Sequence, residues 1–310
     1  FATQMWRTLI GTQMTSKKTR PLLFSMAMLS LTGCRPDQWD LGAPEVLQIS
    51  DYVLNTTPAE GTARHKVEEV WVYSETDVVG VYPLPATVTL PGGEPQTLTL
   101  VPGIRANGIA ATRRTYPFYE VNRVDLDGEP TTEIDHVFEG NYVNTQALQT
   151  KVILAEDFES ANRFLESTNS NVEVQRIIDS KNVFEGDGSG YIRLDSNHTQ
   201  LNAATHEQFY DLPRDRPVYL EFHYKCDVGF VVGLEVFGGS QAGRLPILVL
   251  NPNCNDEGCD WNKIYLDLYP ALSSMPDAGS FEIGLNATIP ADGTEGNIWI
   301  DNFKFVHFDD

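Results

Sequence analysis

The sequence predicts an all-β protein in which a small antiparallel β-sandwich precedes a larger β-sandwich. Runs of five to nine residues with period-two alternation recur along most of the 310 residues, and turns rich in Gly and Pro separate them. Beyond the N-terminal region, the only helix candidate is the segment 159–168 (ESANRFLEST). Many short strands without long helices between them indicate sandwiches rather than a parallel α/β sheet.

The N-terminal region has the order of a secretory signal peptide, with Met14 a better start than Phe1. Three basic residues follow Met14, and an apolar run over residues 22–31 leads into Thr-Gly-Cys. A membrane span needs about 20 apolar residues, and this run is about half as long. The ending resembles a bacterial lipobox, which implies that residues 1–33 are removed and that Cys34 carries the lipid. The alternative is an ordinary signal whose apolar run ends near a cysteine.

A lipid on Cys34 implies that the mature protein is tethered to a membrane. A single acyl chain binds a membrane only marginally, whereas a lipoprotein cysteine carries more than one. Arg35 follows the cysteine where inner-membrane retention favours Asp, so the resemblance implies the outer membrane and leaves the leaflet open. Residues 34–62, rich in Pro, Asp, Gly and Thr, are expected to form a lipidated tether.

The charge balance argues against nucleic acids and anionic lipid surfaces as partners. The chain holds 22 basic and 43 acidic residues, and residues 1–33 contain four of the basic ones and no acidic one. The mature chain therefore has a net charge of −25, which disfavours nucleic acid and anionic lipid surfaces. Most of these carboxylates are expected on a solvated surface.

Residues 63–137 are predicted to form the small sandwich. The stretch VEEVWVYSE (residues 67–75) alternates valine with polar residues and has Trp71 and Tyr73 interleaved, and PGGEP separates two further strand-like runs. The stretch GVYPLPATVTLPGG (residues 80–93) resembles PEGA-like and carboxypeptidase-regulatory-like modules, which implies a spacer on a bacterial surface protein. Residues 138–151 are polar and are expected to be a linker.

Residues 152–310 are predicted to form the larger sandwich, which is the binding domain. Four motifs follow one another there: AEDFES, NVFEGDGSGYIRLD, DWNKIYLDLYP and NIWIDNFKF. Their order resembles that of galactose-binding-like jelly rolls, a group that includes many carbohydrate-binding modules. The resemblance covers about half of the chain and implies a jelly roll that binds polysaccharide.

The same resemblance implies a structural Ca²⁺ between the first and last strands of the jelly roll. The matching candidates are Glu156, Asp157, Glu159 and Asp301, with Asp187 as a further carboxylate. Carboxylates suit Ca²⁺, which takes six to eight oxygen ligands. The alternation of IWIDNFKF places Asp301 on one face with Phe303 and Phe305. The alternative is that Asp157 and Asp301 cap turns or accept backbone hydrogen bonds.

Aromatic faces and hydroxyl-binding polar groups are the expected contacts for a sugar. The candidates are Tyr224, Trp261, Tyr265, Asp267 and Tyr269, together with Tyr210, His206 and His223. In KIYLDLY the alternation places Tyr265, Asp267 and Tyr269 on one face and three aliphatic residues on the other. This stripe is either a sugar platform or a surface that packs under a loop or against the preceding domain. Trp261 is also interpreted as a packing anchor.

Three cysteines remain if Cys34 is lipidated. Cys254 and Cys259 lie in one polar loop and are expected to form a disulfide in an oxidising compartment, although the spacing leaves a pairing with Cys226 open. A zinc site would need a fourth cysteine or a nearby histidine.

No catalytic motif is present: the sequence contains neither HExxH nor GxSxG. The expected function is therefore that of a membrane-anchored, non-catalytic lipoprotein that binds glycans through its C-terminal domain. One alternative is an accessory outer-membrane lipoprotein that docks to a protein partner, and another is a jelly-roll glycosidase or lyase. The layout resembles surface lipoproteins of Bacteroidota.

Overall fold

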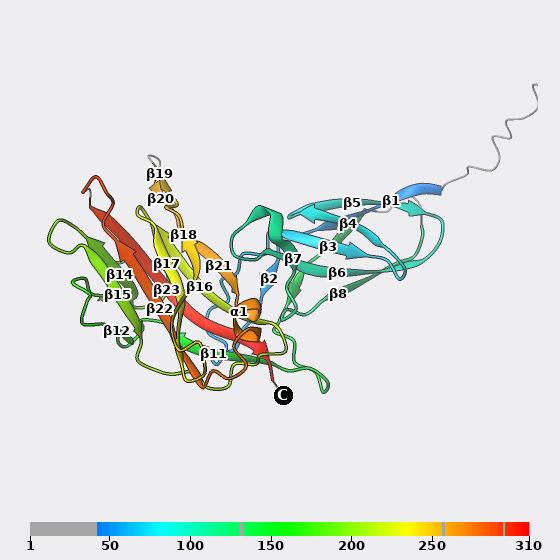
Figure 1. Ribbon diagram of the computed structural model, residues 1–310. Helices are drawn as coiled ribbons and strands as arrows, with labels where there is room; N and C mark the ends of the chain where they lie inside the picture. The colour runs from blue at the N-terminus through cyan, green and yellow to red at the C-terminus, as the bar shows by residue number, and fades with distance from the viewer. Residues whose placement is uncertain (1–41, 130–132, 256–257, 294, 310) are drawn as a thin grey trace, which may run out of the picture. The chain divides into compact units, whose positions relative to one another are not determined.

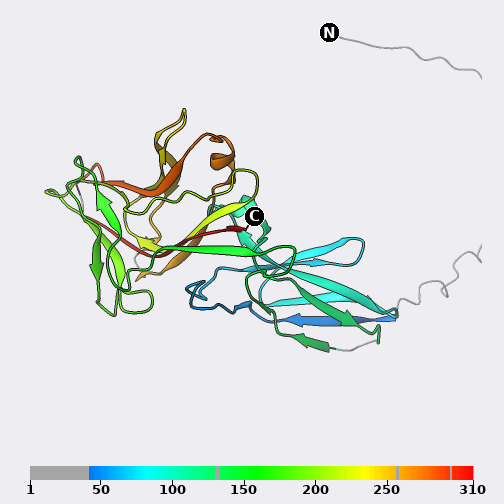
Figure 2. The same cartoon turned by 90° about the horizontal axis from the view of Figure 1, so that it is seen from below.

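A computed structural model describes residues 42–129, 133–255, 258–293 and 295–309. The predicted signal peptide and Cys34 lie outside these residues. From Gly42 on, the chain forms one compact unit with two groups of strands, β1–β10 and β11–β23 (Figures 1 and 2). The predicted all-β class is confirmed. No helix in the described part of the chain has the length and apolar character needed to cross a membrane.

The N-terminal sandwich pairs a three-stranded sheet, β5-β1-β9, with a five-stranded sheet, β4-β3-β6-β7, in which β8 also pairs with β6. A further short pair joins β10 to β2. The elements are β1 (Gly42–Ile49), β2 (Val53–Leu54), β3 (Glu69–Tyr73), β4 (Val78–Pro83), β5 (Ala86–Gly92), β6 (Gln96–Arg105), the 3₁₀ turn η2 (Ala110–Thr112), β7 (Arg113–Thr115), β8 (Asn122–Leu126), β9 (Glu133–His136) and β10 (Glu139–Gly140).

The tether predicted over residues 34–62 is wrong from Gly42 on. Strand β1 pairs with both β5 and β9, and Leu47 and Ile49 are buried in the core of the N-terminal sandwich. The predicted linker 138–151 is likewise structured, since Phe138 and Tyr142 are buried in the same core and β11 begins at residue 150. Burial of apolar side chains orders segments whose turn-forming composition suggested otherwise.

The C-terminal sandwich packs two larger sheets against each other. One has the order β13-β14-β23-β16-β21, with β11 also pairing with β23, and the other has the order β12-β15-β22-β17-β18. The elements are β11 (Thr150–Glu156), β12 (Phe164–Glu166), β13 (Gln175–Ile177), β14 (Ser189–Leu194), β15 (Gln200–Thr205), β16 (Val218–Cys226), β17 (Phe230–Phe237), β18 (Gly243–Leu250), β19 (Cys254–Asn255), β20 (Gly258–Cys259), β21 (Asn262–Asp267), α1 (Tyr269–Ser273), β22 (Ser280–Thr288) and β23 (Gly296–Phe308).

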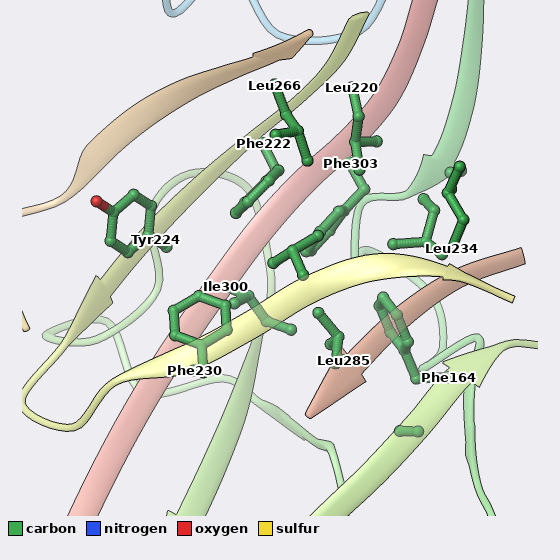
Figure 3. Close-up of a cluster of buried hydrophobic side chains, with 14 of the residues drawn as sticks. Phe164, Leu220, Phe222, Tyr224, Phe230, Leu234, Leu266, Leu285, Ile300 and Phe303 are labelled. Carbon is green, nitrogen blue, oxygen red and sulfur yellow. The ribbon is translucent and has the colours of Figure 1, made fainter. Parts of the chain in front are cut away.

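The core of the C-terminal sandwich lies between its two sheets. Phe222 and Phe303 stack with a centroid distance of 4.6 Å, while Leu234 and Leu285 approach from the opposite sheet (Figure 3). Alternating burial along these strands follows the period of two that the sequence shows. The helix predicted over residues 159–168 is wrong, because part of that segment is strand β12, whose Phe164 reaches this core.

Strand β23 carries a bulge that breaks the predicted alternation. Ile300 and Phe303 both face the core although they are three residues apart, and Asn302 has a φ of 55°. The pairing of β23 with β16 shifts register between Glu221 and His223 at this point. The prediction that Asp301 shares a face with Phe303 is therefore wrong.

A buried charge cluster lies where the two sandwiches meet. Glu221 on β16 has no exposed surface, and its carboxylate lies 2.6 Å from Lys263 Nζ and 3.9 Å from Lys304 Nζ. The Tyr116 hydroxyl of the N-terminal sandwich donates a hydrogen bond to the same carboxylate. Burial alone would raise the pKa of Glu221, but the two ammonium groups outweigh burial and lower it.

Lys304 also ties the segment before β3 to this cluster, since its ammonium donates to the carbonyl of Glu60 at 3.0 Å. Burial lowers the pKa of Lys304 to about 7, against the opposing effect of Glu221. Between pH 7 and the ordinary pKa of lysine, the unfolded chain therefore binds more protons at this site than the folded chain. This difference makes the contribution of Lys304 to stability rise with pH in that window.

We expect the Lys304→Met variant to lose this rise. Its free energy of unfolding relative to wild type should fall between pH 6.5 and pH 8.5, with a slope of at most about 1.4 kcal/mol per pH unit. Urea denaturation at four pH values measures the difference. Lys151→Met, a change at an exposed lysine of β11, serves as the control. Parallel stability curves for Lys304→Met and wild type would contradict the prediction.

Candidate functional site

The predicted stripe of Tyr265, Asp267 and Tyr269 does not form an exposed platform. Ile264 and Leu266 do face the core, as the alternation of β21 predicts. Tyr265 on the other face is only 1% exposed, because it packs against Tyr116 of the N-terminal sandwich at a centroid distance of 5.0 Å. Asp267 accepts a 2.7 Å hydrogen bond from Arg114, and Tyr269 begins helix α1 after the strand has ended. Tyr265 therefore packs against the preceding domain, which is the second of the two possibilities that the sequence left open.

Tyr224 and Trp261 also serve packing. The Tyr224 ring is 6% exposed and faces the core of the C-terminal sandwich, 5.8 Å from the Phe230 ring. Trp261 is partly buried and packs on Phe184 at 5.2 Å, with the Lys225 ammonium 5.4 Å from its ring. The Tyr224 ring is thereby closed to a ligand, and the contacts of Trp261 are those of a packing anchor.

The calcium candidates lie near one another but are occupied as hydrogen-bond acceptors. Glu156 accepts from the backbone N–H groups of Phe158 and Arg163, and Glu159 accepts from that of Asp187. Asp301 accepts from the Ser189 hydroxyl, and Asp157 from the backbone N–H of Glu159. Burial, with the nearby carboxylates Glu159 and Glu185, raises the pKa of Asp301 to about 8.

These carboxylates do not fit the expected metal site. Within the ranges that the structure describes, no three His, Cys, Asp or Glu side chains are placed to hold a metal ion. The carboxylate oxygens instead satisfy backbone N–H groups around the bulge of β23, which is the alternative that the sequence left open.

A disulfide joins Cys254 to Cys259 and closes the β19–β20 hairpin. Cys226 is a free, buried thiol of β16, and burial raises its pKa to about 12. A thiol in this state is inert, because the reactive form is the thiolate.

The outer face of the sheet β12-β15-β22-β17-β18 carries a polar array that the sequence did not reveal. We name it the five-strand face and define it by Asn202, Glu235, Arg244, Glu282 and Asn286. Each of these side chains is partly exposed. Strand pairing sets Asn202 opposite Asn286, and sets Glu235 opposite both Glu282 and Arg244. Five neighbouring strands span about 19 Å, so polar groups extend across a surface of that width.

A row of small residues separates the two polar rows of the five-strand face. Ala204, Gly284, Gly233 and Pro246 are neighbours across four strands. Residues that alternate along one strand are about 6.6 Å apart, so the rows of Asn286 and Glu282 lie about 13 Å from each other across Gly284. Neither glycine has a side chain, so the surface between the two rows is formed by backbone and by the residues that pack over it.

Arg244 lies over this row of glycines. Its Nε is 3.8 Å from the position that a Cβ of Gly284 would take. The guanidinium forms an ion pair with Glu235, while its Nη1 is buried without a hydrogen-bond partner among the described residues. A planar donor group is thereby fixed at the centre of the face.

Glu282 is the second carboxylate of the five-strand face. Gln208 donates a 3.2 Å hydrogen bond to it, and Gln208 also accepts hydrogen bonds from the hydroxyl groups of Ser280 and Tyr210. Burial and the neighbouring Glu235 raise the pKa of Glu282, while Gln208 and His206 lower it less. Tyr210 and His206, which the sequence offered as sugar contacts, therefore lie beside this face.

Asn202 and Asn286, on the other side of the row of glycines, are also linked by hydrogen bonds. Asn286 donates to Asn202 at 3.2 Å, and Asn202 donates to Asn169 at 2.6 Å. Exposed apolar side chains surround the polar centre: Leu165, Tyr210, Phe237 and Val249. Amide, carboxylate and guanidinium groups each present two donors or acceptors in one plane, which suits a ligand with many hydroxyl groups.

No local pattern in the sequence predicts this face, because its residues come from strands separated by up to about 80 positions. The one available hint is the pattern of polar residues that alternate with aliphatic ones in SFEIGLNAT and FVVGLEVF. Alternation identifies the outward residues of each strand, but the register that joins them appears only in the folded sheet.

No protein-family model matches the chain, and no curated protein matches its sequence. Among solved structures, the chain is similar to one described as carbohydrate-binding modules from the beta-sandwich superfamily. The identity is 13% over 78% of this chain and 84% of that chain, with a TM-score of 0.35. It is also similar to the family 11 carbohydrate-binding module of a cellulosomal cellulase of Clostridium thermocellum, with 10% identity over 50% and 94% of the two chains and a TM-score of 0.33.

A further similar structure is the enzymatically active domain of tailspike protein 4 of bacteriophage CBA120. The identity is 17%, the match covers 48% of this chain and 20% of that chain, and the TM-score is 0.33. At such low TM-scores, these likenesses assign no function. The fold assignment rests on the strand order and pairing described above.

Two glycine-to-alanine substitutions in the central row should have different effects on the free energy of unfolding. A Cβ on Gly284 meets no atom closer than 3.8 Å, whereas one on Gly233 would lie 2.3 Å from the carbonyl oxygen of Leu245. We expect Gly284→Ala to leave stability unchanged or to raise it by up to about 1 kcal/mol. Gly233→Ala should lower it by about 1–3 kcal/mol. Urea denaturation of both variants tests this, and equal effects would contradict the geometry.

Proposed function

We propose that the chain is a glycan-binding protein and that the five-strand face holds a neutral polysaccharide. The observation that carries the proposal is the array of planar polar groups on an open sheet face, with exposed apolar side chains around it. Hydroxyl groups of a sugar would accept from Arg244 and donate to Glu282, while apolar sugar faces would contact Tyr210 and Phe237. A protein with this function binds the polysaccharide and does not cleave it.

The charge of the face favours neutral over acidic sugars. Two carboxylates and one guanidinium leave it with a negative balance in a chain whose net charge is −21. A carboxylated or sulfated chain would meet repulsion both at the face and from the protein as a whole.

Docking to a protein partner is supported less well by the same surface. The cores of protein–protein interfaces are depleted in charged residues, whereas the centre of the five-strand face holds Glu235, Arg244 and Glu282. Its apolar residues stand at the rim rather than in one continuous patch.

Two substitutions test the proposal directly. Gly284→Val places a branched side chain on the central row beneath Arg244, and Glu282→Gln removes the charge of one acceptor while it keeps the shape. We expect each to weaken binding of cellohexaose or mannohexaose by roughly tenfold or more, because valine displaces the Arg244 donor and Glu282→Gln removes about one strong polar contact. Isothermal titration calorimetry with the full chain measures the change.

Val78→Ala, a change at an exposed position of β4 in the N-terminal sandwich, is the control and should bind as wild type does. Unchanged affinity in both face variants, with wild-type thermal stability, would remove the five-strand face from the proposal.

A second function, cleavage of a glycosidic bond, is favoured by one observation. Glu235 and Glu282 are direct cross-strand neighbours; Glu235 forms an ion pair with Arg244, while burial raises the pKa of Glu282. Glycosidases use two carboxyl groups in unlike environments on either side of the scissile bond. Release of new reducing ends from the hexaoses, lost in Glu282→Gln, would support cleavage, and intact hexaoses after prolonged incubation would exclude it for these substrates.

We also propose that Cys34 carries a lipid that anchors the protein to the outer membrane, with the N-terminal sandwich as a spacer. The lipobox-like order of residues 22–34 supports this proposal. Cells that express the chain should incorporate an alkyne-labelled palmitate into it and retain it in the membrane fraction. Cys34→Ala should abolish both, whereas Cys226→Ala should abolish neither. Equal labelling of wild type and Cys34→Ala would contradict the anchor.

A further inference from the structure

A pocket of about 580 Å³ lies at the edge of the C-terminal sandwich where β12, β13 and β14 meet. The loop after β12, strand β13 and the turn after β14 form its walls. Its lining includes Glu166, Asn171, Gln175, Tyr191 and Arg193. None of these residues belongs to the five-strand face. The volume falls in the range that suits a small ligand.

Tyr191 is held rigidly at this pocket. Its ring packs against Trp299 of β23, with a centroid distance of 5.3 Å and an interplanar angle of 32°. Its hydroxyl donates a 2.6 Å hydrogen bond to the Asn297 side chain. The Lys225 ammonium lies 4.8 Å from the Trp299 ring centroid, and 5.4 Å from that of Trp261. A row of rings and one cation across the sheet thus fixes the orientation of Tyr191.

Tyr191 forms part of the pocket wall, and Trp299 packs on its ring from the neighbouring strand. Strand pairing sets Tyr191 between Trp299 on one side and Gln175 of the edge strand β13 on the other. Tyr191 lines the pocket and Trp299 does not. An aromatic face that is already immobile binds an apolar ring face with little loss of conformational entropy.

The rest of the lining is polar and carries a negative balance. Arg193 is paired with Glu295 at 2.9 Å and with Asp195 at 3.8 Å, so its charge is compensated. Glu166 and Glu173 add two further carboxylates. Such a lining repels an anionic ligand and offers donors and acceptors to hydroxyl groups.

We propose that this pocket is a second carbohydrate site, which takes one or two neutral hexopyranose units at the end of a glycan, stacked on Tyr191. The inference rests on the proposed function in one respect, because it assigns the same class of ligand to the same sandwich. It uses different residues and a different ligand geometry. A pocket of this volume, bordered by a loop and a turn, holds a chain end or a single sugar, whereas the five-strand face extends far enough for the interior of a chain.

Short and long probes distinguish the two sites. Isothermal titration calorimetry of the full chain uses the methyl glycosides of glucose, galactose and mannose, and then cellohexaose and mannohexaose. We expect one of the methyl glycosides to bind at one site per chain. Tyr191→Ala should weaken that binding by roughly tenfold or more, whereas Tyr191→Phe, which keeps the ring, should retain most of it. Gly284→Val should leave it unchanged.

A second variant guards against misfolding in Tyr191→Ala. Gln175 is exposed on the edge strand, so Gln175→Trp should fill the pocket without disturbing the core, and it should abolish binding of the methyl glycoside. If hexaoses bind and only the five-strand variants weaken them, while no methyl glycoside binds, the pocket proposal is overturned and the proposed function stands. If methyl glycosides bind and only the pocket variants matter, the pocket stands and the five-strand face does not. No binding of any probe to folded wild-type protein overturns both.

Discussion

The structure depends on one buried carboxylate. Glu221 is fully removed from water at the seam of the two sandwiches, and a buried charge is tolerated only where partners surround it. Lys263 and Lys304 come from the C-terminal sandwich, and Tyr116 comes from the N-terminal one. Removal of one partner would leave a charge unpaired, so the cluster fixes how β16, β21 and β23 face the N-terminal sandwich. The aromatic packing of Tyr265 and Tyr219 follows from that arrangement.

The seam between the two sandwiches explains why the sequence predicted the fold class but also predicted, wrongly, that Tyr265 would lie on an exposed surface. Alternation along β21 predicts its inward residues, Ile264 and Leu266, because that signal is local. What the outward face meets depends on residues about 150 positions away, such as Arg114 and Tyr116. An outward Tyr-Asp pair looks the same in sequence whether water, sugar or another sandwich covers it.

Strand β1 was missed for a related reason. GAPEVLQI contains Gly and Pro in its first half, which indicates a turn, yet its second half pairs with β5 about 40 residues later and with β9 more than 80 residues later. The five-strand face posed the same difficulty. Asn202 and Asn286, or Glu235 and Glu282, become neighbours only through long-range register. Aromatic residues are the usual sequence signal of a sugar-binding surface, whereas the centre of this face is made of amides, carboxylates and a guanidinium.

The two sheets of the C-terminal sandwich are used unequally, and the seam is the cause. The sheet that contains β23 has one end of its outer face covered by the N-terminal sandwich, through Tyr219 and Tyr265, and its middle filled by the row from Tyr191 to Trp261. The strands of the other sheet, β12-β15-β22-β17-β18, contribute no residue to the buried apolar cluster that the N-terminal sandwich shares with Tyr219 and Tyr265. Its outer face therefore carries partly exposed polar side chains on four of its strands, β15, β22, β17 and β18. At the β13–β14 edge of the first sheet, beyond this row, the loop after β12 and the turn after β14 border a pocket. The two proposed sites therefore lie on different sheets, because the N-terminal sandwich covers part of one outer face and leaves the other uncovered.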